Sequence, residues 1–558
     1  MKKTPFFWVL RQIRSRIPAI LGMTAAQICH ALFCVFFALG SRAVIDSAVQ
    51  GEIGVFINSC IRQTGIITGI LVSAAAFRHL HDRLHAELER DWKKRLLHGL
   101  LHGEYASVSQ YHSAELLNRL NNDVNKVNEG ILTTIPNAAA MLTRLIAAVV
   151  VLGVLDVRFM LLIGTLGLMI VVATGLVRQR LKELDKQVSA HDGRVSGFLQ
   201  EILEKLLMVQ TMDASDEIEN RAEKLLDGRY DLQRKRKNIS LLTNTGVSLM
   251  SYGAGFLALC WCGYCMLLNQ MSFGSLTAVI QLVNQLQVPF IGLSGILPRY
   301  VAMIASAERL MELETIQGEP ILSDEMPEKM YREMDAIAAE NLSFAYDRDQ
   351  ILMDASFKLP KGAFAVITGP SGMGKSTILK LLLGIYRPEH GQLYLHGNNG
   401  NVLLDRSTRR LFSYVPQGNL LLSGTLRDNL TIIKPDATEE ELQQAVYVSA
   451  MDEFMSQLPQ GLDTPLGENG TGLSEGQAQR LAIARAVLGG APILLLDECT
   501  SALDAETEEK VLRRLRLLPN RTCIAVTHRP AAIALCDWQL EVIDGTISVT
   551  KDGIGAYK

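Results

Sequence analysis

The sequence of 558 residues has few charged side chains, few aromatic side chains and no excess of either charge. Only 20% of its residues are charged, whereas about a quarter is usual for a soluble protein. The 55 basic and 58 acidic side chains nearly cancel, which argues against general binding of nucleic acid. Because 48% of the residues are hydrophobic, disorder is excluded, and at this length a single compact domain is excluded as well.

The nine cysteines do not form a metal-binding pattern. Cys260, Cys262 and Cys265 make a C-x-C-x-x-C run, but it lies in an apolar stretch and has no histidine partner. Cys499 and Cys523 lie in the more polar C-terminal part, where reduced thiols are expected. Cysteine chemistry is therefore not the basis of function.

Six long apolar stretches lie in the first 300 residues, and they explain the positive mean hydropathy of +0.17. Each has the length of roughly 20 residues that a helix needs to cross a bilayer. They predict six membrane spans, at about 17–45, 55–77, 135–155, 159–177, 241–268 and 273–297.

Basic residues gather on one side of these spans, and the short connections on the other side carry little positive charge. The positive-inside rule therefore places both termini and the two long connections in the cytoplasm. The connections cover 78–134 and 178–240 and are rich in helix-forming residues. A leg of 25 helical residues would reach roughly 40 Å from the membrane, at about 1.5 Å per residue. The two connections are interpreted either as solvated hairpins or as helices that carry motion to the C-terminal part.

A phosphate-binding loop follows the apolar strand Phe364–Thr368 and precedes a helical run. Its sequence, G-P-S-G-M-G-K-S-T, fits G-x-x-x-x-G-K-[ST], in which backbone N–H groups and a helix N-terminus face a phosphate chain. Lys375 is expected to reach the β- and γ-phosphates, and Ser376 to bind Mg²⁺. The predicted nucleotide site comprises Gly369, Pro370, Ser371, Gly372, Met373, Gly374, Lys375, Ser376 and Thr377.

A second apolar strand, Ile493–Asp497, ends in two carboxylates about 120 residues after the loop. Asp497 is the candidate acid beside Mg²⁺, and Glu498 is the candidate general base. Two carboxylates are needed because a group held at the metal is poorly placed to polarise water.

A third motif lies about 20 residues before Asp497. Leu473-Ser-Glu-Gly-Gln477 and the following Ala478–Arg485 resemble the signature motif of ATP-binding cassette (ABC) proteins. This resemblance covers about 335–558. The first half is similar, less strongly, to the six-helix domain of type I ABC exporters, at Glu115–Asp123 and Ser272–Leu276.

The resemblance implies roles for further residues. Ser474, Gly476 and Gln477 would bind nucleotide held by an opposite subunit, whereas Glu475 stands where the family usually has glycine. Glu475 should weaken nucleotide binding unless it points away, and it either tunes the ATPase or marks one half of an asymmetric pair. The remaining matches are Tyr346 for adenine stacking, Gln417 for sensing Mg²⁺, Gly467-Glu468 for contact with coupling helices, Asp504 between subunits and His528 as the switch histidine.

The predicted fold is an all-α six-helix transmembrane domain with long cytoplasmic helical extensions, followed by an α/β P-loop ATPase cassette. The predicted boundaries are 1–316 for the transmembrane domain, 317–334 for a linker and 335–558 for the cassette. The resemblance implies that two cassettes pair head to tail, each completing the other's site. The chain would then be half of a homodimer or of a heterodimer.

Polar residues in the predicted spans are candidates for a substrate cavity. Thr277, Gln281, Asn284 and Gln285 share one face of the sixth span. Arg144 would either attract an anionic or zwitterionic substrate, make an interhelical hydrogen bond or lie at the cytoplasmic membrane surface. The expected function is ATP-driven export of a small or amphiphilic molecule, such as a drug, lipid or peptide, across the plasma membrane, with membrane lipids as further partners. Uptake, for example of a metal chelate, and a cassette that gates or regulates without pumping are the alternatives.

Overall fold

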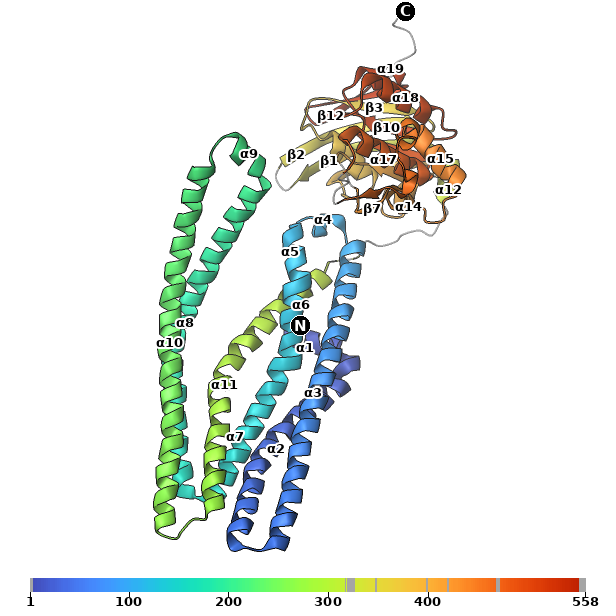
Figure 1. Cartoon of the computed structure of the whole chain (residues 1–558). Coiled ribbons are helices and arrows are strands. Elements are labelled where there is room, and N and C mark those ends of the chain that lie inside the picture. Colours follow the sequence, from blue (N-terminus) through green and yellow to red (C-terminus); the bar gives the residue numbers. More distant parts are fainter. Residues whose placement is uncertain are drawn as a thin grey trace, which may run out of the picture. The chain divides into compact units, whose positions relative to one another are not determined.

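The structure is a computed structural model that describes residues 4–316, 318, 327–346, 349–397, 400–418, 421–467 and 472–550. It divides into two compact units (Figure 1). The first unit comprises Met1–Leu101 and His112–Thr315, and the second comprises His102–Tyr111 and Ile316–Lys558. The short segment His102–Tyr111 therefore belongs to the second unit although the first unit surrounds it in the sequence.

The first unit is helical, and each predicted span lies on one long helix, apart from Leu268, which is the C-cap of α10. Asp156 begins one of these helices by accepting from the N–H groups of Arg158 and Phe159, and Ser272 caps another. The elements are α1 (Pro5–Gln12), η1 (Arg14–Arg16), α2 (Ile17–Gln50), α3 (Ile53–His102), α5 (Ser113–Asn118), η2 (Arg119–Asp123), α6 (Val124–Glu129), η3 (Gly130–Thr134), α7 (Ile135–Leu155), α8 (Val157–Glu204), α9 (Leu206–Thr211), α10 (Ser215–Leu267) and α11 (Phe273–Glu314).

Within the described residues, four helical stretches are long and apolar enough to cross a membrane. They are Arg14–Gln50, Ile53–His102, Ser113–Leu155 and Ser215–Leu267. The spans predicted at 159–177 and 273–297 lie on α8 and α11, where several side chains are outside the description.

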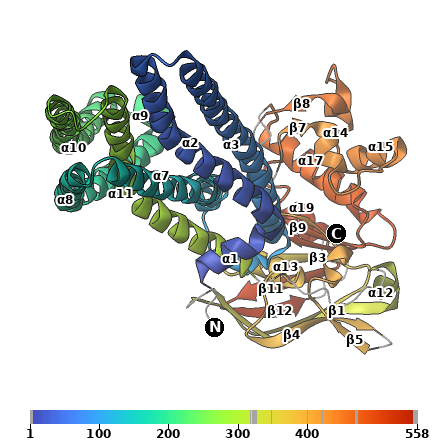
Figure 2. The same ribbon diagram turned by 90° about the horizontal axis from the view of Figure 1, so that it is seen from below.

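The long helical extensions are confirmed. Helix α3 continues from the predicted span end near Phe77 to His102, and α8 continues to Glu204. Helices α8 and α10 lie side by side and are joined through α9 (Figures 1 and 2). Arg229 and Arg236 on α10 pair with Asp192 and Asp185 on α8, so ion pairs as well as packing hold this hairpin together.

A buried ionic cluster fixes α11 to the chain between α5 and α7. The Asp123 carboxylate is fully buried and accepts from Ser306 Oγ at 2.9 Å and from Arg309 Nε at 2.8 Å. Both η2 and η3 are π-helical turns. Gly130 on η3 lies directly against the Met303 side chain of α11, because a Cβ at this position would be 2.2 Å from the Met303 sulfur. Since a buried carboxylate needs partners, this cluster specifies where α11 crosses the segment.

The described residues of the second unit form three sheets. The largest has the order β12-β11-β3-β10-β9-β6, in which β11, β3, β10, β9 and β6 are parallel. A second sheet, β2-β1-β4-β5, is antiparallel, and β7 pairs with β8. The strands are β1 (Met334–Tyr346), β2 (Asp349–Pro360), β3 (Phe364–Thr368), β4 (His390–Gly397), β5 (Gly400–Leu403), β6 (Phe412–Val415), β7 (Gly424–Thr425), β8 (Pro465–Leu466), β9 (Ile493–Asp497), β10 (Thr522–Val526), β11 (Trp538–Ile543) and β12 (Thr546–Thr550).

Helices pack against this sheet, and every residue of β3, β9 and β10 is buried, as expected for a covered parallel sheet. The carboxyl ends of these neighbouring strands meet at one edge, where such folds bind ligands. The helices are α4 (Tyr105–Val108), α12 (Pro327–Glu333), α13 (Lys375–Leu382), α14 (Leu426–Thr431), α15 (Glu439–Val448), α16 (Asp452–Met455), α17 (Glu475–Leu488), α18 (Ala505–Arg516) and α19 (Pro530–Leu535), with η4 (Thr408–Leu411) and η5 (Gly461–Asp463).

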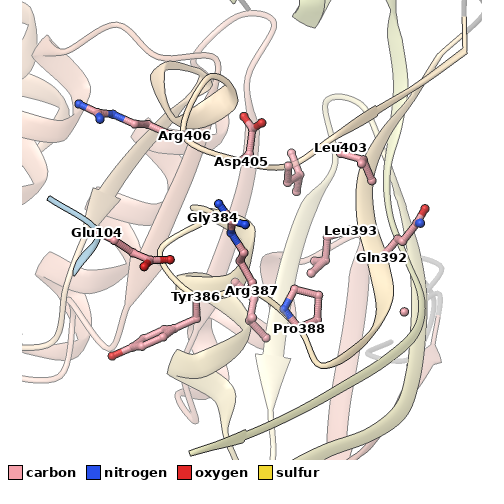
Figure 3. A pocket seen from close by; sticks show the side chains of 13 residues that line it. Glu104, Gly384, Tyr386, Arg387, Pro388, Gln392, Leu393, Leu403, Asp405 and Arg406 are labelled. Atoms are coloured by element: carbon pink, nitrogen blue, oxygen red, sulfur yellow. The ribbon is translucent and has the colours of Figure 1, made fainter. Parts of the chain in front are cut away.

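The segment His102–Tyr111 carries α4 and packs within the second unit. Gly103 forms a β-bridge with Gly318, and the Tyr105 ring meets the Tyr386 ring edge-on at 6.2 Å between centroids. Beside it lies a pocket of about 320 Å³ lined by Glu104 of the segment and by side chains that include Tyr386 and Arg387 (Figure 3). The segment therefore completes a surface of the second unit.

Candidate functional site

The predicted phosphate loop connects β3 to α13, and two of its glycines are required by its shape. Gly369 has φ of 140°, and a Cβ there would lie 2.5 Å from Val542 O. Gly374 has φ of 85°, and a Cβ there would lie 2.3 Å from Ile351 Cγ2. Pro370, Ser371 and Gly372 form the exposed part of the loop, and Met373 is half-buried.

Helix α13 begins at Lys375, so the positive end of its dipole faces the loop. The buried Lys375 ammonium donates to the carbonyl oxygens of Gly369 and Pro370, each at 2.8 Å. Thr377 donates to Tyr346 Oη at 3.4 Å, which joins α13 to the predicted adenine-stacking ring. The loop therefore combines N–H groups, a dipole and a cation, which is the chemistry of an anion site.

The candidate metal acid Asp497 is buried at the end of β9. Ser376 Oγ donates to its Oδ1 at 2.9 Å, and Tyr414 Oη donates to its Oδ2 at 3.1 Å. Burial raises the pKa of Asp497, whereas these two hydrogen bonds oppose the rise. Burial and the neighbouring Asp497 carboxylate raise the pKa of Tyr414, so its hydroxyl remains a donor. Sequence reasoning missed Tyr414.

The candidate base Glu498 has a backbone φ of 48°, which is unusual for a residue with a side chain. Its N–H donates to Val526 O at 3.0 Å, so β10 holds the strained position. Gln417 Nε2 donates to Glu498 Oε2 at 2.7 Å. Because an ionised carboxylate only accepts, the amide nitrogen faces it, and Gln417 Oε1 is left for another partner. His528 is exposed just beyond the end of β10.

The signature residues form the start of α17. Ser474 is its N-cap, and Ser474 and Gln477 make a reciprocal capping box with N···O distances of 2.8 and 3.3 Å. A Cβ at Gly476 would lie 2.9 Å from Ala502 O, so glycine allows α17 to approach the loop before α18. Glu475 is exposed in the first turn, where a carboxylate is favourable to the helix dipole.

The loop 500–504 is held from two sides by residues that sequence reasoning missed. Gln479 donates to Ser501 Oγ and accepts from Ala502 N, both at 3.0 Å. Arg529 donates to Leu503 O at 2.7 Å, to Ser501 O at 2.5 Å and to the buried carboxylate of Glu508 at 3.0 Å. Asp504 ends the loop as the N-cap of α18, and the N–H of Thr507 holds its pKa low.

Aromatic rings surround the predicted adenine position. Tyr346 meets Phe344 edge-on at 4.9 Å and Tyr386 edge-on at 5.3 Å. Tyr386 is also the ring that Tyr105 contacts, so a line of rings leads from Tyr346 to the segment His102–Tyr111. Of the predicted pair Gly467-Glu468, Glu468 lies outside the described residues.

The predicted substrate-cavity residues are only partly brought together. Gln285 donates to Cys34 O on α2, and Thr277 donates to Phe273 O of its own helix at 3.2 Å. Asn284 is exposed and accepts from Gln287, whereas Gln281 has a buried Oε1 without a partner among the described residues. Arg144 is half-buried on α7. Part of the polar face of α11 is thus used for packing against α2.

Comparison with known proteins agrees with this architecture. Residues 19–290 match the family described as ABC transporter transmembrane region, and residues 352–501 match the family described as ABC transporter. A solved structure entitled "Structure of a bacterial Atm1-family ABC exporter with ATP bound" has the same fold, with a TM-score of 0.77 and 24% identity, over 96% of this chain and 94% of that one.

Three curated relatives align with parts of the chain. A probable ABC transporter ATP-binding/permease protein of Haemophilus influenzae is 32% identical over 60% of this chain and 59% of its own length. The putative multidrug export ATP-binding/permease protein YgaD of Bacillus subtilis is 28% identical over 78% and 75%. The mycobactin import ATP-binding/permease protein IrtB of Mycobacterium tuberculosis is 42% identical over 39% and 38%.

A helical membrane region and a nucleotide-binding α/β unit in one chain define a multi-pass membrane protein with an ATP-binding cassette. The chain belongs to the ABC transporter family, with the family's transmembrane region and its ATP-binding cassette fused in that order.

Proposed function

We propose that this chain is one half of an ATP-driven transporter that exports a small or amphiphilic molecule. The observation that carries the proposal is the convergence of the phosphate loop, Asp497, Glu498 and His528 at the carboxyl ends of β3, β9 and β10. These groups are the parts that phosphoryl transfer to water needs, and they are fused to membrane helices.

Each group has a task in hydrolysis that follows from its place. The loop N–H groups, the α13 dipole and Lys375 bind the phosphates and offset their negative charge. Glu498 orients and polarises the attacking water, with its carboxylate fixed by Gln417. His528, exposed at the neighbouring strand end, stabilises charge on the γ-phosphate.

The oxygen donors at this edge fit a magnesium ion. Ser376 Oγ, Asp497 and Gln417 Oε1 are hard oxygen donors, and they are the residues that would hold Mg²⁺ or its bound water. No cluster of three or more His, Cys, Asp or Glu ligands occurs in the described part of the chain, in keeping with an ion that takes most of its ligands from phosphate and water. Bound there, Mg²⁺ would neutralise charge on the phosphates.

A second cassette completes the site. The capped start of α17, with Ser474, Gly476 and Gln477, offers N–H groups to a nucleotide held by a partner, and the loop ending at Asp504 packs beside it. The predicted catalytic residues are all present, which supports a homodimer and equally the competent half of a heterodimer. We place the protein in the plasma membrane with both termini and the cassette in the cytoplasm, where ATP is found.

The substrate class rests on relatives. The Bacillus subtilis relative is named for multidrug export, which favours export of an amphiphilic molecule. The Mycobacterium tuberculosis relative is named for mycobactin import, so uptake is the second candidate. Inverted membrane vesicles discriminate the two: export predicts ATP-dependent accumulation of a fluorescent amphiphile inside them, and uptake predicts its loss from preloaded vesicles.

The direct test of the proposed hydrolysis is Glu498→Gln in the full-length chain, reconstituted in nanodiscs. Loss of a general base reduces turnover by about 10²- to 10⁴-fold. ATP binding should persist, because Glu498 is not needed to hold the phosphates. The matched control is Glu541→Gln, at an exposed position on β11, and it should hydrolyse ATP like the unaltered chain. Undiminished hydrolysis by Glu498→Gln would remove Glu498 as the base. An unaltered chain without ATPase activity, with or without a partner half, would favour a regulatory cassette.

A further inference from the structure

The hydroxyl of Tyr414 occupies a place that the hydrolysis mechanism does not explain. Strands β6 and β9 are parallel neighbours, with Tyr414 opposite Leu495. From this register the ring reaches the end of β9, where Oη donates to Asp497 Oδ2 at 3.1 Å. The other oxygen of the same carboxylate accepts from Ser376 Oγ at 2.9 Å.

Two donors on two different elements therefore hold the two oxygens of one buried carboxylate. Asp497 is only 1% exposed, so water cannot replace a lost donor easily. A carboxylate with a single donor turns more freely about its Cβ–Cγ bond. The Ser376 contact comes from the first turn of α13, directly after the phosphate loop, whereas the Tyr414 contact comes from β6.

We propose that Tyr414 is a positioning residue for magnesium. Its hydroxyl fixes the rotation of the Asp497 carboxylate, so that Oδ1 stays beside Ser376 Oγ, on the side where the metal of a bound nucleotide would lie. Tyr414 itself contacts neither nucleotide nor metal, and it acts only through Asp497. The inference rests on the proposed function, because it assumes that this edge binds ATP with Mg²⁺.

The alternative is that Tyr414 only fills space between β6 and its neighbours. The ring is half-buried, and a phenylalanine would fill the same volume. Tyr414→Phe therefore separates the two roles, because it removes the hydroxyl and keeps the ring.

The experiment measures nucleotide binding without hydrolysis. Tyr414→Phe is made in the Glu498→Gln chain, the full-length protein is placed in nanodiscs, and a fluorescent ATP analogue is titrated with Mg²⁺ or with EDTA. One lost hydrogen bond to a charged group corresponds to about a tenfold or greater change in an equilibrium constant. We expect affinity with Mg²⁺ to fall about tenfold and affinity in EDTA to change less than about twofold.

The matched control is Tyr394→Phe. The Tyr394 hydroxyl donates a hydrogen bond to Glu340 within the antiparallel sheet. The phosphate loop follows β3, which belongs to the other sheet. Tyr394→Phe should leave the affinity for the ATP analogue unchanged both with Mg²⁺ and with EDTA. An equal loss with Mg²⁺ and with EDTA would show that the hydroxyl supports nucleotide binding independently of the metal, and unchanged affinities would show that the hydroxyl has no role in nucleotide binding. Either result overturns the inference. If the Glu498→Gln parent itself binds no ATP analogue, the proposed function fails instead.

Discussion

Arg529 tests whether the loop 500–504 is held as the structure indicates. Arg529→Ala removes two hydrogen bonds to loop carbonyls and leaves the carboxylate of Glu508 without its cation. Glu508 is only 2% exposed, and its other carboxylate oxygen accepts from Thr500 Oγ1 at 2.9 Å. The perturbation therefore creates a buried charge with one neutral donor.

The magnitude follows from this burial. Breaking a buried ion pair by removing one partner costs about 3–5 kcal/mol. The Arg529 side chain is 32% exposed, so water reaches part of the site and reduces the loss. We expect the free energy of unfolding of the cassette to fall by about 2–3 kcal/mol. For a domain of about 200 residues, this loss lowers the unfolding midpoint by about 4–12 °C. ATPase activity should fall as well, because the loop carries Asp504.

Calorimetry of the full-length chain in detergent measures the unfolding midpoint. The double variant Arg529→Ala with Glu508→Gln is the informative comparison, since it removes the orphaned charge and should recover part of the loss. Arg513→Ala is the matched control, because Arg513 pairs with Glu509 on the surface and should cost less than about 1 kcal/mol. A loss in Arg529→Ala no larger than in this control, or no recovery in the double variant, would refute the reasoning.

Two further predictions concern stability. The N–H of Thr425 donates to Asp428 at 2.8 Å and lowers the pKa of this carboxylate. Its stabilising effect is therefore complete above the unfolded pKa of about 4 and is lost as the pH falls through the lower folded pKa. Asp428→Asn should make the unfolding midpoint depend less steeply on pH below about pH 4. If the midpoint fell with decreasing pH as steeply as in the unaltered chain, this role of Asp428 would be contradicted. In the first unit, Gly130→Ala places a Cβ within 2.8 Å of Met303 Cβ and 2.2 Å of its sulfur, so it should cost about 1–3 kcal/mol. Met303→Ala in the same chain removes the sulfur and Cγ but keeps Cβ, so the loss in the double variant should be smaller than the sum of the two single losses. Additive losses would exclude the predicted clash.

Much of the cassette could be predicted because its chemistry is local in sequence. A strand, a glycine loop and a helix follow one another at 364–382, and the two carboxylates end a single apolar strand. Fold class was predictable for the same reason, since spans and motifs are continuous segments. Each residue that was missed acts across a long sequence separation: Tyr414 meets Asp497 83 residues away, and Gln479 meets Ser501 22 residues away.

The polar face of α11 shows the opposite limit. Helical spacing placed Gln281, Asn284 and Gln285 together, but spacing does not distinguish a side chain that lines a cavity from one that bonds a neighbouring helix. Gln285 bonds Cys34 O of α2, which only the packing of α2 against α11 decides. The sequence did contain one indication of the role of Tyr414. Its hydroxyl lies three residues before Gln417, on a strand that pairs with β9.

The two parts of the second unit, His102–Tyr111 and Ile316–Lys558, are synthesised at different times, because the first unit separates them in the sequence. Tyr105 leaves the ribosome about 280 residues before Tyr386, the ring that it contacts. At about 5–20 residues per second, this interval lasts about 14–56 s, during which the membrane helices between them are made and the segment has no surface to pack on. All residues of the second unit are therefore present only after the C-terminal stretch of the chain has been made. A split of the gene near residue 316 would give a second product that lacks ten of the residues of its own compact unit.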